Sequence, residues 1–404
     1  MSKRLLLLGL GMQGQAALHD LAARPEFSSI VVVDSRDDLA AQVARYPEEK
    51  VRAVHCDIAD QTRIAAMIGL SDVVVEALPA ACALRMGQLA ASQGVPLVSS
   101  MYYYNPDGLS PADAAAMRSS VDELDQLAKQ RRVPILTEFG MDPGLDLLMA
   151  ARAVSEFDQV QEFYTYGAGL PAGDARLNPL QYKFSWSPIG VMRSYRRSST
   201  VVRGGRAEVV PAAEIFEARH CHSIDVTELG TPLECFPNGD AVHYAELLGI
   251  RHGLRESGRF TGRYPGHCAF WNTAVKIGLL GVQPVSAGGT SVSAAEFMAA
   301  ALSGQPQFQY AEGERDLSFI RVEARGLKHG KPLHVTYQLL DYRDLTTGFT
   351  AMQRTVGFTM SRGAQLIAAG KVAKPGLLTP LDVPYDDVLP ALEHHGIHVS
   401  ISRD

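Results

Sequence analysis

The feature that most constrains the fold of this chain is a glycine-rich turn near its amino terminus. Residues 9–14 read Gly-Leu-Gly-Met-Gln-Gly, directly after the apolar run 5–8 and before residues 15–21, whose composition favours a helix. A strand that enters such a turn and continues as a helix brings backbone N–H groups close to a pyrophosphate, where side chains would block the approach. The pattern therefore predicts a dinucleotide-binding turn. The candidate contacts are Gly9, Gly11, Met12, Gln13 and Gly14.

An acidic residue at the end of the second apolar run supports this prediction. The run 30–33 ends in Asp34, twenty residues after Gly14, which is the offset expected for an acid that binds the ribose. A carboxylate there hydrogen-bonds the two ribose hydroxyls and repels a 2′-phosphate, so we expect NAD rather than NADP. Ser35 and Arg36 follow immediately and could accommodate part of that phosphate, which leaves NADP open.

Six strand-like apolar runs alternate with helical patterns in the first third of the chain. This alternation is typical of a parallel sheet covered on both faces, so we predict a doubly wound α/β (Rossmann) domain over residues 1–140. Pro134 cannot donate to a ladder, which suits the last run to the sheet edge. The runs are 5–8, 30–33, 51–55, 73–75, 96–98 and 133–136.

Ligands of such a sheet lie beyond the carboxyl ends of its strands. We therefore expect the residues after the fourth and fifth strands to lie near the cofactor: Ala77, Leu78, Pro79 and Ser99. Asp57, after the third strand, could contact the adenine or equally cap the turn into the next helix.

Three consecutive tyrosines, residues 102–104, follow the fifth strand. They cannot all face one core, so at least one should reach solvent or a ligand, while packing of the loop on a helix explains the other two equally well. Asp142 follows the sixth strand and precedes Pro143. It is suited equally to a helix N-cap and to acid–base chemistry at the lip of a cofactor crevice.

The pattern changes beyond about residue 150. Longer stretches with alternating polar residues predict half-exposed antiparallel strands, and two of them, 317–324 and 333–340, flank a glycine-containing turn and should form a hairpin. We expect a second α+β domain over residues 141–345, with an open mixed sheet and helices near 189–195, 269–280 and 294–302. Residues 346–404 should add helices and a short strand that return to the first domain.

Composition excludes several classes of protein. The formal net charge is −6, with 38 basic and 44 acidic residues, which gives no reason to expect nucleic acid or an anionic membrane as a partner. No apolar run approaches the roughly 20 residues that span a bilayer, and glycines interrupt the first run too soon for a secretion signal.

The five cysteines lack paired spacing, so we expect free thiols in the cytoplasm. His220 and His222 lack further ligands at zinc spacing, so we expect no metal.

Five segments, in this order, resemble the saccharopine dehydrogenase (glutamate-forming) family, also called saccharopine reductase. They are 138–146 (Glu-Phe-Gly-Met-Asp-Pro-Gly-Leu-Asp), 169–172 (Gly-Leu-Pro-Ala), 182–188 (Tyr-Lys-Phe-Ser-Trp-Ser-Pro), 263–266 (Arg-Tyr-Pro-Gly) and 351–357 (Ala-Met-Gln-Arg-Thr-Val-Gly). Lysine 6-dehydrogenases share the first domain and the Pro-Gly element, but they resemble this chain less around residues 184–187. The resemblance implies hydride transfer at a carbon that bears nitrogen, a nicotinamide cofactor and a homodimer.

The resemblance also assigns roles to individual residues. Asp142 matches the active-site aspartate, Tyr102 and Tyr103 compete for the role of the active-site tyrosine, and Trp186 matches a tryptophan of the substrate pocket. Two positions depart from the family: Gly167 replaces a cysteine, and Gly239 replaces an arginine that would clamp a substrate carboxylate. This second loss should weaken a diacid ligand, so saccharopine itself is in doubt as the substrate. The remaining candidates for holding a substrate carboxylate are Arg251, Arg263 and Arg193, and Gly169 is a further candidate for substrate binding.

Three functions fit these residues. The first is a saccharopine dehydrogenase-like oxidoreductase that acts on an amino acid-derived secondary amine or imine, with Asp142, partly desolvated by the cofactor and Trp186, as the base. The second is a primary-amine dehydrogenase of the lysine 6-dehydrogenase kind, which needs no second carboxylate clamp. The third is a non-catalytic protein that binds a dinucleotide.

Overall fold

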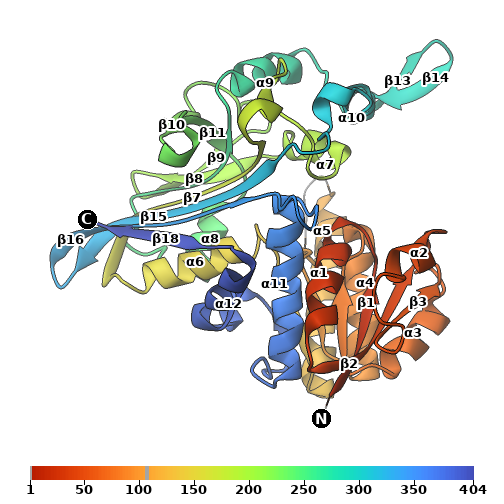
Figure 1. Ribbon diagram of the computed structural model, residues 1–404. Helices are drawn as coiled ribbons and strands as arrows, with labels where there is room; N and C mark the ends of the chain where they lie inside the picture. Colours follow the sequence, from red (N-terminus) through yellow and green to blue (C-terminus); the bar gives the residue numbers. More distant parts are fainter. Residues whose placement is uncertain (1, 105–108) are drawn as a thin grey trace. The chain divides into compact units, whose positions relative to one another are not determined.

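The computed structural model describes residues 2–104 and 109–404 (Figure 1). The chain forms two compact units. The first consists of Met1–Leu148 with Gln353–Gly396, and the second of Met149–Met352 with Ile397–Asp404. Each unit is described by itself below.

The first unit contains a parallel sheet of seven strands in the order β17-β6-β5-β4-β1-β2-β3, which confirms the predicted doubly wound fold. Its strands are β1 (Lys3–Leu8), β2 (Phe27–Asp34), β3 (Val51–His55), β4 (Val73–Glu76), β5 (Leu97–Ser99), β6 (Pro134–Leu136) and β17 (Gly376–Leu378). Strand β6 is not the edge strand that Pro134 suggested, because β17 pairs with it. Pro134 is the first residue of β6, a position that tolerates the missing N–H.

The helices of this unit are α1 (Met12–Ala23), α2 (Leu39–Val43), α3 (Gln61–Gly69), α4 (Ala80–Gln93), α5 (Pro111–Arg131), α11 (Ala351–Ala368) and α12 (Tyr385–Leu392), with α6 (Leu145–Val154) leading into the second unit. On one face of the sheet, Leu6 and Leu8 pack into a core with side chains of α3, α4 and α5. Strand side chains alternate between the two faces, so Leu5 and Leu7 are buried on the opposite face. Helix α11 packs so closely on α1 that a Cβ at Gly357 would lie 2.6 Å from the Cβ of Ala16.

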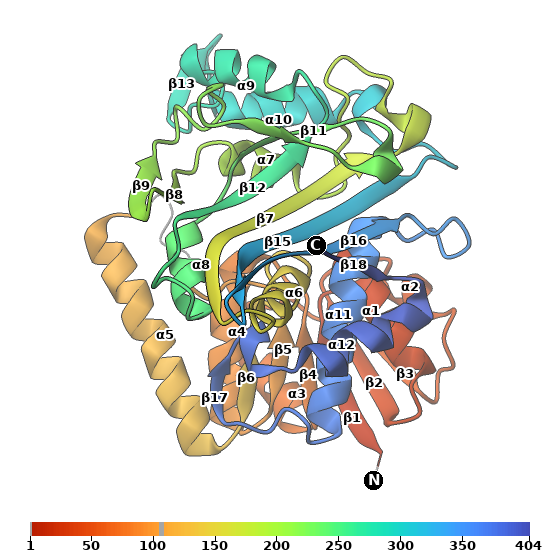
Figure 2. The same ribbon diagram turned by 90° about the vertical axis from the view of Figure 1, so that its left-hand side faces the viewer.

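The second unit contains an open mixed sheet of nine strands, as predicted. Strands β10-β11-β12-β7-β15-β16-β18 lie in this order, and β8 and β9 extend from β12. Only the β12–β7 pair is parallel. The strands are β7 (Gln159–Pro171), β8 (Ser199–Arg203), β9 (Arg206–Val210), β10 (His222–Ile224), β11 (Leu233–Pro237), β12 (Glu256–Arg263), β15 (Asp316–Lys328), β16 (Lys331–Tyr342) and β18 (Val399–Arg403). Figure 2 shows β12, β7 and β15 side by side, with β15 and β16 forming the predicted hairpin.

The predicted helices of the second unit are present as α7 (Pro188–Ser194), α9 (His267–Lys276) and α10 (Ala294–Ser303). The structure adds α8 (Ala241–Leu247) and a separate hairpin of β13 (Pro284–Ala287) and β14 (Thr290–Ser293). Short 3₁₀ helices span Gly173–Arg176, Thr227–Leu229 and Pro306–Phe308 in this unit, and Pro380–Asp382 and Glu393–His395 in the first unit.

The last strand corrects one prediction. We expected it to return to the first domain, but β18 pairs antiparallel with β16 in the sheet of the second unit. Without β18, the long strand β16 would present an edge of unpaired backbone groups. All five cysteines are free, as predicted. Among the described residues, every helix is too short or too polar to cross a membrane.

Candidate cofactor site and active site

The glycine turn is shaped by contacts that leave no room for side chains. A Cβ at Gly14 would lie 2.1 Å from the carbonyl oxygen of Gly9, and a Cβ at Gly9 would lie 2.6 Å from that of Ala77. In contrast, a Cβ at Gly11 would meet no atom within 4 Å. Gly11 is the N-cap of α1 and offers no side-chain oxygen to the first N–H groups of the helix. These groups and the open space beside Gly11 fit the phosphates of a dinucleotide.

Asp34 is fixed beside this turn by two backbone donors. Its Oδ2 accepts a hydrogen bond from the N–H of Leu10 at 2.6 Å, and its Oδ1 accepts one from the N–H of Arg36 at 2.9 Å. The Arg36 guanidinium donates to the carbonyl oxygen of Leu10 at 2.9 Å and pairs with Asp38 at 2.5 Å. Ser35 is exposed between them. The structure therefore places both the carboxylate that favours NAD and the cation that suits a 2′-phosphate next to the turn.

Asp57 caps a turn. It is exposed, and its Oδ1 accepts a hydrogen bond from the N–H of Ala59 at 2.8 Å. Asp60 takes the N-cap position of α3 and accepts from the N–H of Arg63. Of the two alternatives for Asp57, a contact with the adenine or a cap of the turn, this hydrogen bond favours the cap.

The loops after β4 and β5 are joined by a residue that the sequence analysis missed. Glu76 ends β4, is fully buried, and accepts hydrogen bonds from the N–H of Leu78 at 2.7 Å and from Ser99 Oγ at 2.5 Å. Burial raises the pKa of Glu76 to about 7, although these two hydrogen bonds act in the opposite direction. Its only signal in the sequence is an acidic residue at the end of a run of three valines.

The three tyrosines have different environments. Tyr103 is 4% exposed in the hydrophobic core of the first unit, and a Cβ at Gly87 would lie 2.5 Å from its ring. This burial favours Tyr102 over Tyr103 as the tyrosine that contacts a ligand. Tyr104 stacks under the guanidinium of Arg118 at 3.6 Å. Tyr102 is half-buried and is the preferred candidate.

Asp142 lies in a tight turn and not at a helix N-cap. Helix α6 begins at Leu145, beyond Pro143, and Asp146 accepts the N–H of Gly144 at 2.8 Å. The turn requires glycine, because a Cβ at Gly144 would lie 2.1 Å from the carbonyl oxygen of Gly140. Asp142 itself is exposed. Of the two alternatives for Asp142, the position of the helix start disfavours the cap.

The candidate substrate residues belong to the second unit. Trp186 is half-buried against Gly190, and a Cβ at Gly169 would lie 3.1 Å from Met352 and 3.3 Å from Ser185 Oγ. Arg251 donates to the carbonyl oxygen of Gly205 at 3.2 Å, and Arg193 is exposed.

The glycine that replaces the family's arginine lies beside another guanidinium. A Cβ at Gly239 would lie 3.5 Å from Nη1 of Arg259, which comes from the neighbouring strand β12. The Arg259 guanidinium lies over the ring of Tyr244 at 3.6 Å. Gly167, the second departure, pairs with Ile320 in the central β7–β15 ladder.

Arg263 is a buried cation. It is 5% exposed, and no described carboxylate forms an ion pair with it. It donates to the carbonyl oxygen of Gly262 at 2.8 Å and to the hydroxyl of Tyr195 at 3.4 Å, and it lies 5.0 Å from the ring centre of Tyr182. Burial, and then the charge of Arg263, lower the pKa of His267 well below its usual value, so this histidine is neutral. The Tyr182 hydroxyl and His267 Nδ1 are buried without hydrogen-bond partners among the described residues.

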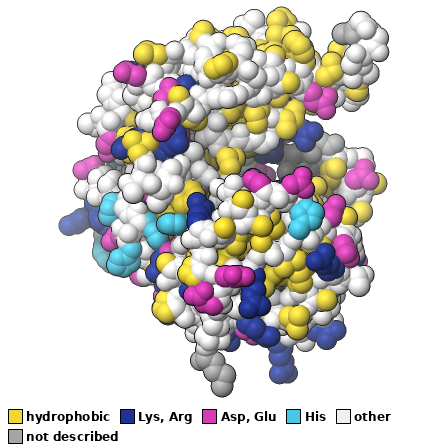
Figure 3. All heavy atoms as spheres, turned by 45° about the vertical axis from the view of Figure 1, so that its right-hand side comes forward, with side chains coloured by type: hydrophobic (Ala, Val, Ile, Leu, Met, Phe, Trp, Pro, Cys, Tyr) yellow, Lys and Arg dark blue, Asp and Glu magenta, His cyan; other side chains and the backbone are white. Residues whose placement is uncertain are grey.

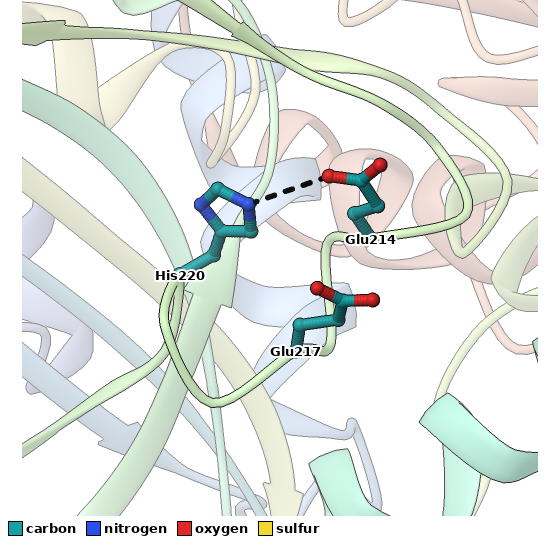
Figure 4. A group of neighbouring side chains, drawn as sticks. All are labelled: Glu214, Glu217 and His220. Carbon is teal, nitrogen blue, oxygen red and sulfur yellow. Dashed lines mark ion pairs between the residues drawn. The ribbon is translucent and has the colours of Figure 1, made fainter.

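A histidine–carboxylate group was also missed by the sequence analysis. Successive backbone turns, Glu217 N–H to Glu214 O and His220 N–H to Glu217 O, bring these three side chains together, with ligand atoms within 4.8 Å of one another (Figure 4). Arg219 pairs with both carboxylates, at 2.5 and 2.9 Å, and Lys276 pairs with Glu217 at 2.9 Å.

The histidine of this group faces a further cation. Arg203 lies 3.3 Å from His220 Nδ1 and can only donate, so in the neutral ring the proton is on Nε2, which faces Glu214 at 3.7 Å. Arg219 and Lys276 already pair with the two carboxylates, so we describe the group as a network of ion pairs.

Comparisons with known proteins agree with these features. Residues 5–136 match the family model for the saccharopine dehydrogenase NADP binding domain, and residues 140–397 match that for the saccharopine dehydrogenase C-terminal domain. The NADP(+)-dependent, L-glutamate-forming saccharopine dehydrogenase of Saccharomyces cerevisiae is 25% identical, in an alignment that covers 96% of both chains. The mitochondrial alpha-aminoadipic semialdehyde synthase of Bos taurus is 24% identical over 98% of this chain. The chain spans about half the length of that relative, 47%.

Solved structures show the same fold. The apo saccharopine dehydrogenase (L-Glu forming) from Saccharomyces cerevisiae superimposes with a TM-score of 0.84 over 100% of both chains, at 22% identity. A homospermidine synthase from Legionella pneumophila in complex with NAD gives a TM-score of 0.65 at 11% identity, covering 100% of this chain and 92% of that one. Because the two family models together cover nearly the whole sequence, this chain belongs to the saccharopine dehydrogenase family.

Proposed function

We propose that this chain is an NAD(P)-dependent oxidoreductase that transfers hydride at a C–N bond of an amino acid-derived secondary amine or imine. The observation that carries the proposal is the glycine turn, with its open space at Gly11 and uncapped helix α1, beside Asp34. The names of relatives that share both domains, saccharopine dehydrogenase and alpha-aminoadipic semialdehyde synthase, support the C–N bond as the target.

The proposed chemistry needs a base. A bound dinucleotide accepts hydride from the carbon that bears nitrogen, and the amine has to be neutral before this carbon can release it. We assign the proton transfer to Asp142, which would also deprotonate the water that attacks the resulting iminium. Tyr102 would hold or relay this proton. We prefer Tyr102 to its neighbour Tyr103, because Tyr103 is buried in the hydrophobic core.

Replacing Asp142 by Asn tests this assignment. We expect kcat to fall at least about a hundredfold, the usual contribution of a general base, while the dinucleotide Kd changes less than about twofold. Asp122→Asn, on the exposed side of α5, is the matched control and should behave as the wild type. Unchanged turnover in Asp142→Asn would remove Asp142 from the mechanism.

The cofactor preference depends on Asp34 and Arg36. Relatives named as NADP(+)-dependent favour NADP, which the sequence analysis left open, whereas the Asp34 carboxylate favours NAD. Arg36→Ala separates the two, because it removes the cation and leaves the carboxylate. We expect this variant to lose kcat/KM with NADP selectively. An equal loss with both cofactors would show that Arg36 only stabilises the turn.

We propose that Arg263 binds a carboxylate of the substrate. An arginine cannot lose its proton, and a buried charge without a counter-ion is costly, so an anionic ligand would stabilise this position. Arg263→Lys should raise the KM of a carboxylate-bearing amine about tenfold or more, since a lysine cannot form the bidentate pair. It should leave a decarboxylated analogue unaffected. Exposed Arg206→Lys is the control. Equal effects on both amines would refute this role.

A homodimer is supported by exposed apolar side chains around α9, the β13–β14 hairpin and α10. Hydrophobic side chains are visible in the upper part of the face drawn in Figure 3. The exposed large hydrophobic residues of this region are Phe270, Ile277, Leu279, Val282, Val285 and Phe297. Patches of this kind usually mark an interface. Phe297→Glu should shift the mass measured by light scattering from dimer to monomer; a wild-type monomer would exclude the proposal.

One alternative has an observation in its favour. Gly239 removes the clamp for a second carboxylate, as a lysine 6-dehydrogenase-like enzyme acting on a primary amine would allow. Incubation with NAD or NADP and either saccharopine, lysine or other opine-like amines, followed by nicotinamide absorbance, separates the two activities. No absorbance change with any of these amines would favour a non-catalytic dinucleotide-binding protein.

A further inference from the structure

Glu76 lies where the two halves of the parallel sheet meet. Its partners in the ladders are Leu8 on β1 and Ser99 on β5. The chain proceeds outward from β1 through β2 to β3 on one side, and outward from β4 through β5 to β6 on the other. Ligands of such sheets bind beyond the carboxyl ends of the strands at this reversal. Glu76 therefore lies beneath the proposed dinucleotide site.

The carboxyl group of Glu76 joins two loops without the help of a cation. No described lysine, arginine or histidine forms an ion pair with it, and it is 0% exposed. Its two acceptor oxygens are used by the loop after β4, through Leu78, and by the end of β5, through Ser99. A buried carboxylate held only by two hydrogen bonds is expensive to ionise, so hydrophobic packing does not account for its presence.

Ser99 extends this connection to a third loop. Its Oγ accepts a hydrogen bond from the N–H of Met101 at 3.0 Å, and its carbonyl oxygen accepts one from the N–H of Phe139 at 2.9 Å. The carbonyl oxygen of Met101 accepts the N–H of Glu138 at 3.2 Å. The tyrosine loop is thereby tied to the segment that leads into the turn of Asp142.

We propose that Glu76 is a positioning residue for the proposed reaction: its carboxyl group holds the loops after β4, β5 and β6 in the arrangement that presents Tyr102 and Asp142. This inference rests on the proposed function for its kinetic consequence. Its structural consequence, the coupling of the loops, can be tested without turnover.

The ionisation of Glu76 should control how firmly these loops are held. Burial brings the pKa of Glu76 to about 7, so its charge changes near neutral pH. Because burial outweighs the two hydrogen bonds, ionisation weakens the closed arrangement, and the loops should open more easily as the pH rises through 7. When protonated, the carboxyl has to donate to Ser99, because the N–H of Leu78 can only donate.

The surroundings of Glu76 can accept this reversal. Among the described residues, Tyr103 is the titratable group that faces Glu76; burial and the charge of Glu76 both raise the pKa of this phenol. The Tyr103 hydroxyl has no hydrogen-bond partner among the described residues. It can therefore accept a hydrogen bond from Ser99 Oγ when Glu76 donates to that oxygen. The hydrogen bonds reverse, and a neutral carboxyl group, which is less costly to bury, keeps the loops joined.

Hydrogen exchange tests the coupling directly. Wild type and Glu76→Gln are compared at pH 6 and pH 8 by mass spectrometry of peptides covering residues 76–80 and 97–102, with correction for intrinsic exchange rates. Glutamine keeps the size and the acceptor for Leu78 but cannot titrate. We expect wild-type protection to fall about tenfold from pH 6 to pH 8, because ionisation of a carboxyl group with a raised pKa favours the open loops, and the variant to show no such fall. Protection in the wild type that does not change with pH would overturn the proposal.

Two further variants complete the exchange experiment. Glu123→Gln, on exposed α5, is the matched control and should follow the wild type. Ser99→Ala removes the link to the tyrosine loop, so it should lower protection of residues 97–102 at both pH values even if Glu76→Gln fails to fold. If residues 97–102 are protected as strongly in Ser99→Ala as in the wild type, the proposal would also be contradicted.

Kinetics separate a positioning role from a purely structural one. We expect kcat of Glu76→Gln to fall about tenfold, the effect of about one lost hydrogen bond on a barrier, with the KM for the dinucleotide within about twofold. The variant should also lose an inflection of kcat near pH 7. A fall in kcat that keeps the inflection would overturn the role of Glu76. If no amine reduces the cofactor, the proposed function fails, while the exchange experiment still decides the coupling.

Discussion

A buried aspartate on α1 should account for a large part of the stability of the first unit. Asp20 is 4% exposed, and its carboxylate accepts hydrogen bonds from two residues of α11, Ser361 at 2.6 Å and Gln365 at 2.9 Å. Arg24 donates to it at 2.5 Å, and His395 lies at 3.1 Å. These contacts connect α1 with the carboxyl-terminal part of the unit. We predict that Asp20→Asn destabilises this unit strongly at neutral pH.

The magnitude follows from the pKa of Asp20. Burial alone would raise this pKa, but hydrogen bonds from His395, Arg24 and Ser361 outweigh burial and lower it from 3.8 to about 2. A difference of nearly two pKa units corresponds to about 2.5 kcal/mol. Because the folded-state pKa is depressed, this stabilisation is present above about pH 4 and is lost as the pH falls toward 2. The Asn variant should therefore differ from the wild type by about 2.5 kcal/mol at pH 7 and by progressively less below pH 4.

The two units can be followed separately during unfolding in urea. Both tryptophans, Trp186 and Trp271, belong to the second unit, so fluorescence reports that unit, whereas circular dichroism reports both. With a urea dependence of about 2 kcal/mol/M, Asp20→Asn should move the dichroism transition of the first unit by about 1 M and leave the tryptophan transition in place. Asp72→Asn, which breaks a partly exposed pair with Arg4, should cost less than about 1 kcal/mol. A loss below about 1 kcal/mol for Asp20→Asn at pH 7, or an undiminished loss at pH 3, would refute the reasoning.

The remaining predictions concern the turn and Glu76. Gly11→Ala should leave the unfolding midpoint within about 0.5 kcal/mol of the wild type, because a Cβ there meets no atom, but it should weaken dinucleotide binding at least about tenfold in a fluorescence titration; unchanged affinity would mean that the phosphates do not lie beside Gly11. Gly14→Ala should lose both stability and binding, because its Cβ would lie 2.1 Å from a carbonyl oxygen; wild-type thermal unfolding would contradict this. Glu76→Gln should be more stable than the wild type at pH 8 by up to about 3 kcal/mol, and this gain should vanish near pH 4.5 in urea unfolding; a constant difference across this range would show that Glu76 does not titrate as described.

The parts of the fold that the sequence predicted correctly are those encoded by local patterns. Short runs rich in apolar residues predicted six strands of the first sheet, and the spacing from Gly14 to Asp34 placed the carboxylate beside the turn. Strands β17 and β18 were not assigned correctly, because their places depend on long-range pairing with β6 and β16.

The candidate site was predictable only where composition itself indicates the chemistry. Three adjacent tyrosines suggested a ligand, but their separation into a core ring, a ring under Arg118 and the half-buried Tyr102 depends on packing against α4 and α5. Glu76 resembled any strand-end acid, and its role became visible only when the register placed it opposite Ser99. The group of Glu214, Glu217 and His220 required the backbone turns that bring residues three apart onto one side.

The two buried carboxyl groups of the first unit affect stability in opposite directions. The free energy of unfolding increases through Asp20 as the pH rises from 2 to 4, because the folded-state pKa of this residue is depressed. Glu76, whose pKa is raised to about 7, removes stability as the pH rises from about 4.5 to 7. The stabilising group lies at the contact between α1 and α11, and the destabilising one lies at the ligand edge of the sheet. Buried groups that cost stability at neutral pH are characteristic of functional sites, and glutamine would fill the same volume without that cost. The presence of Glu76 is therefore better explained by the loops that it holds than by the stability of the fold.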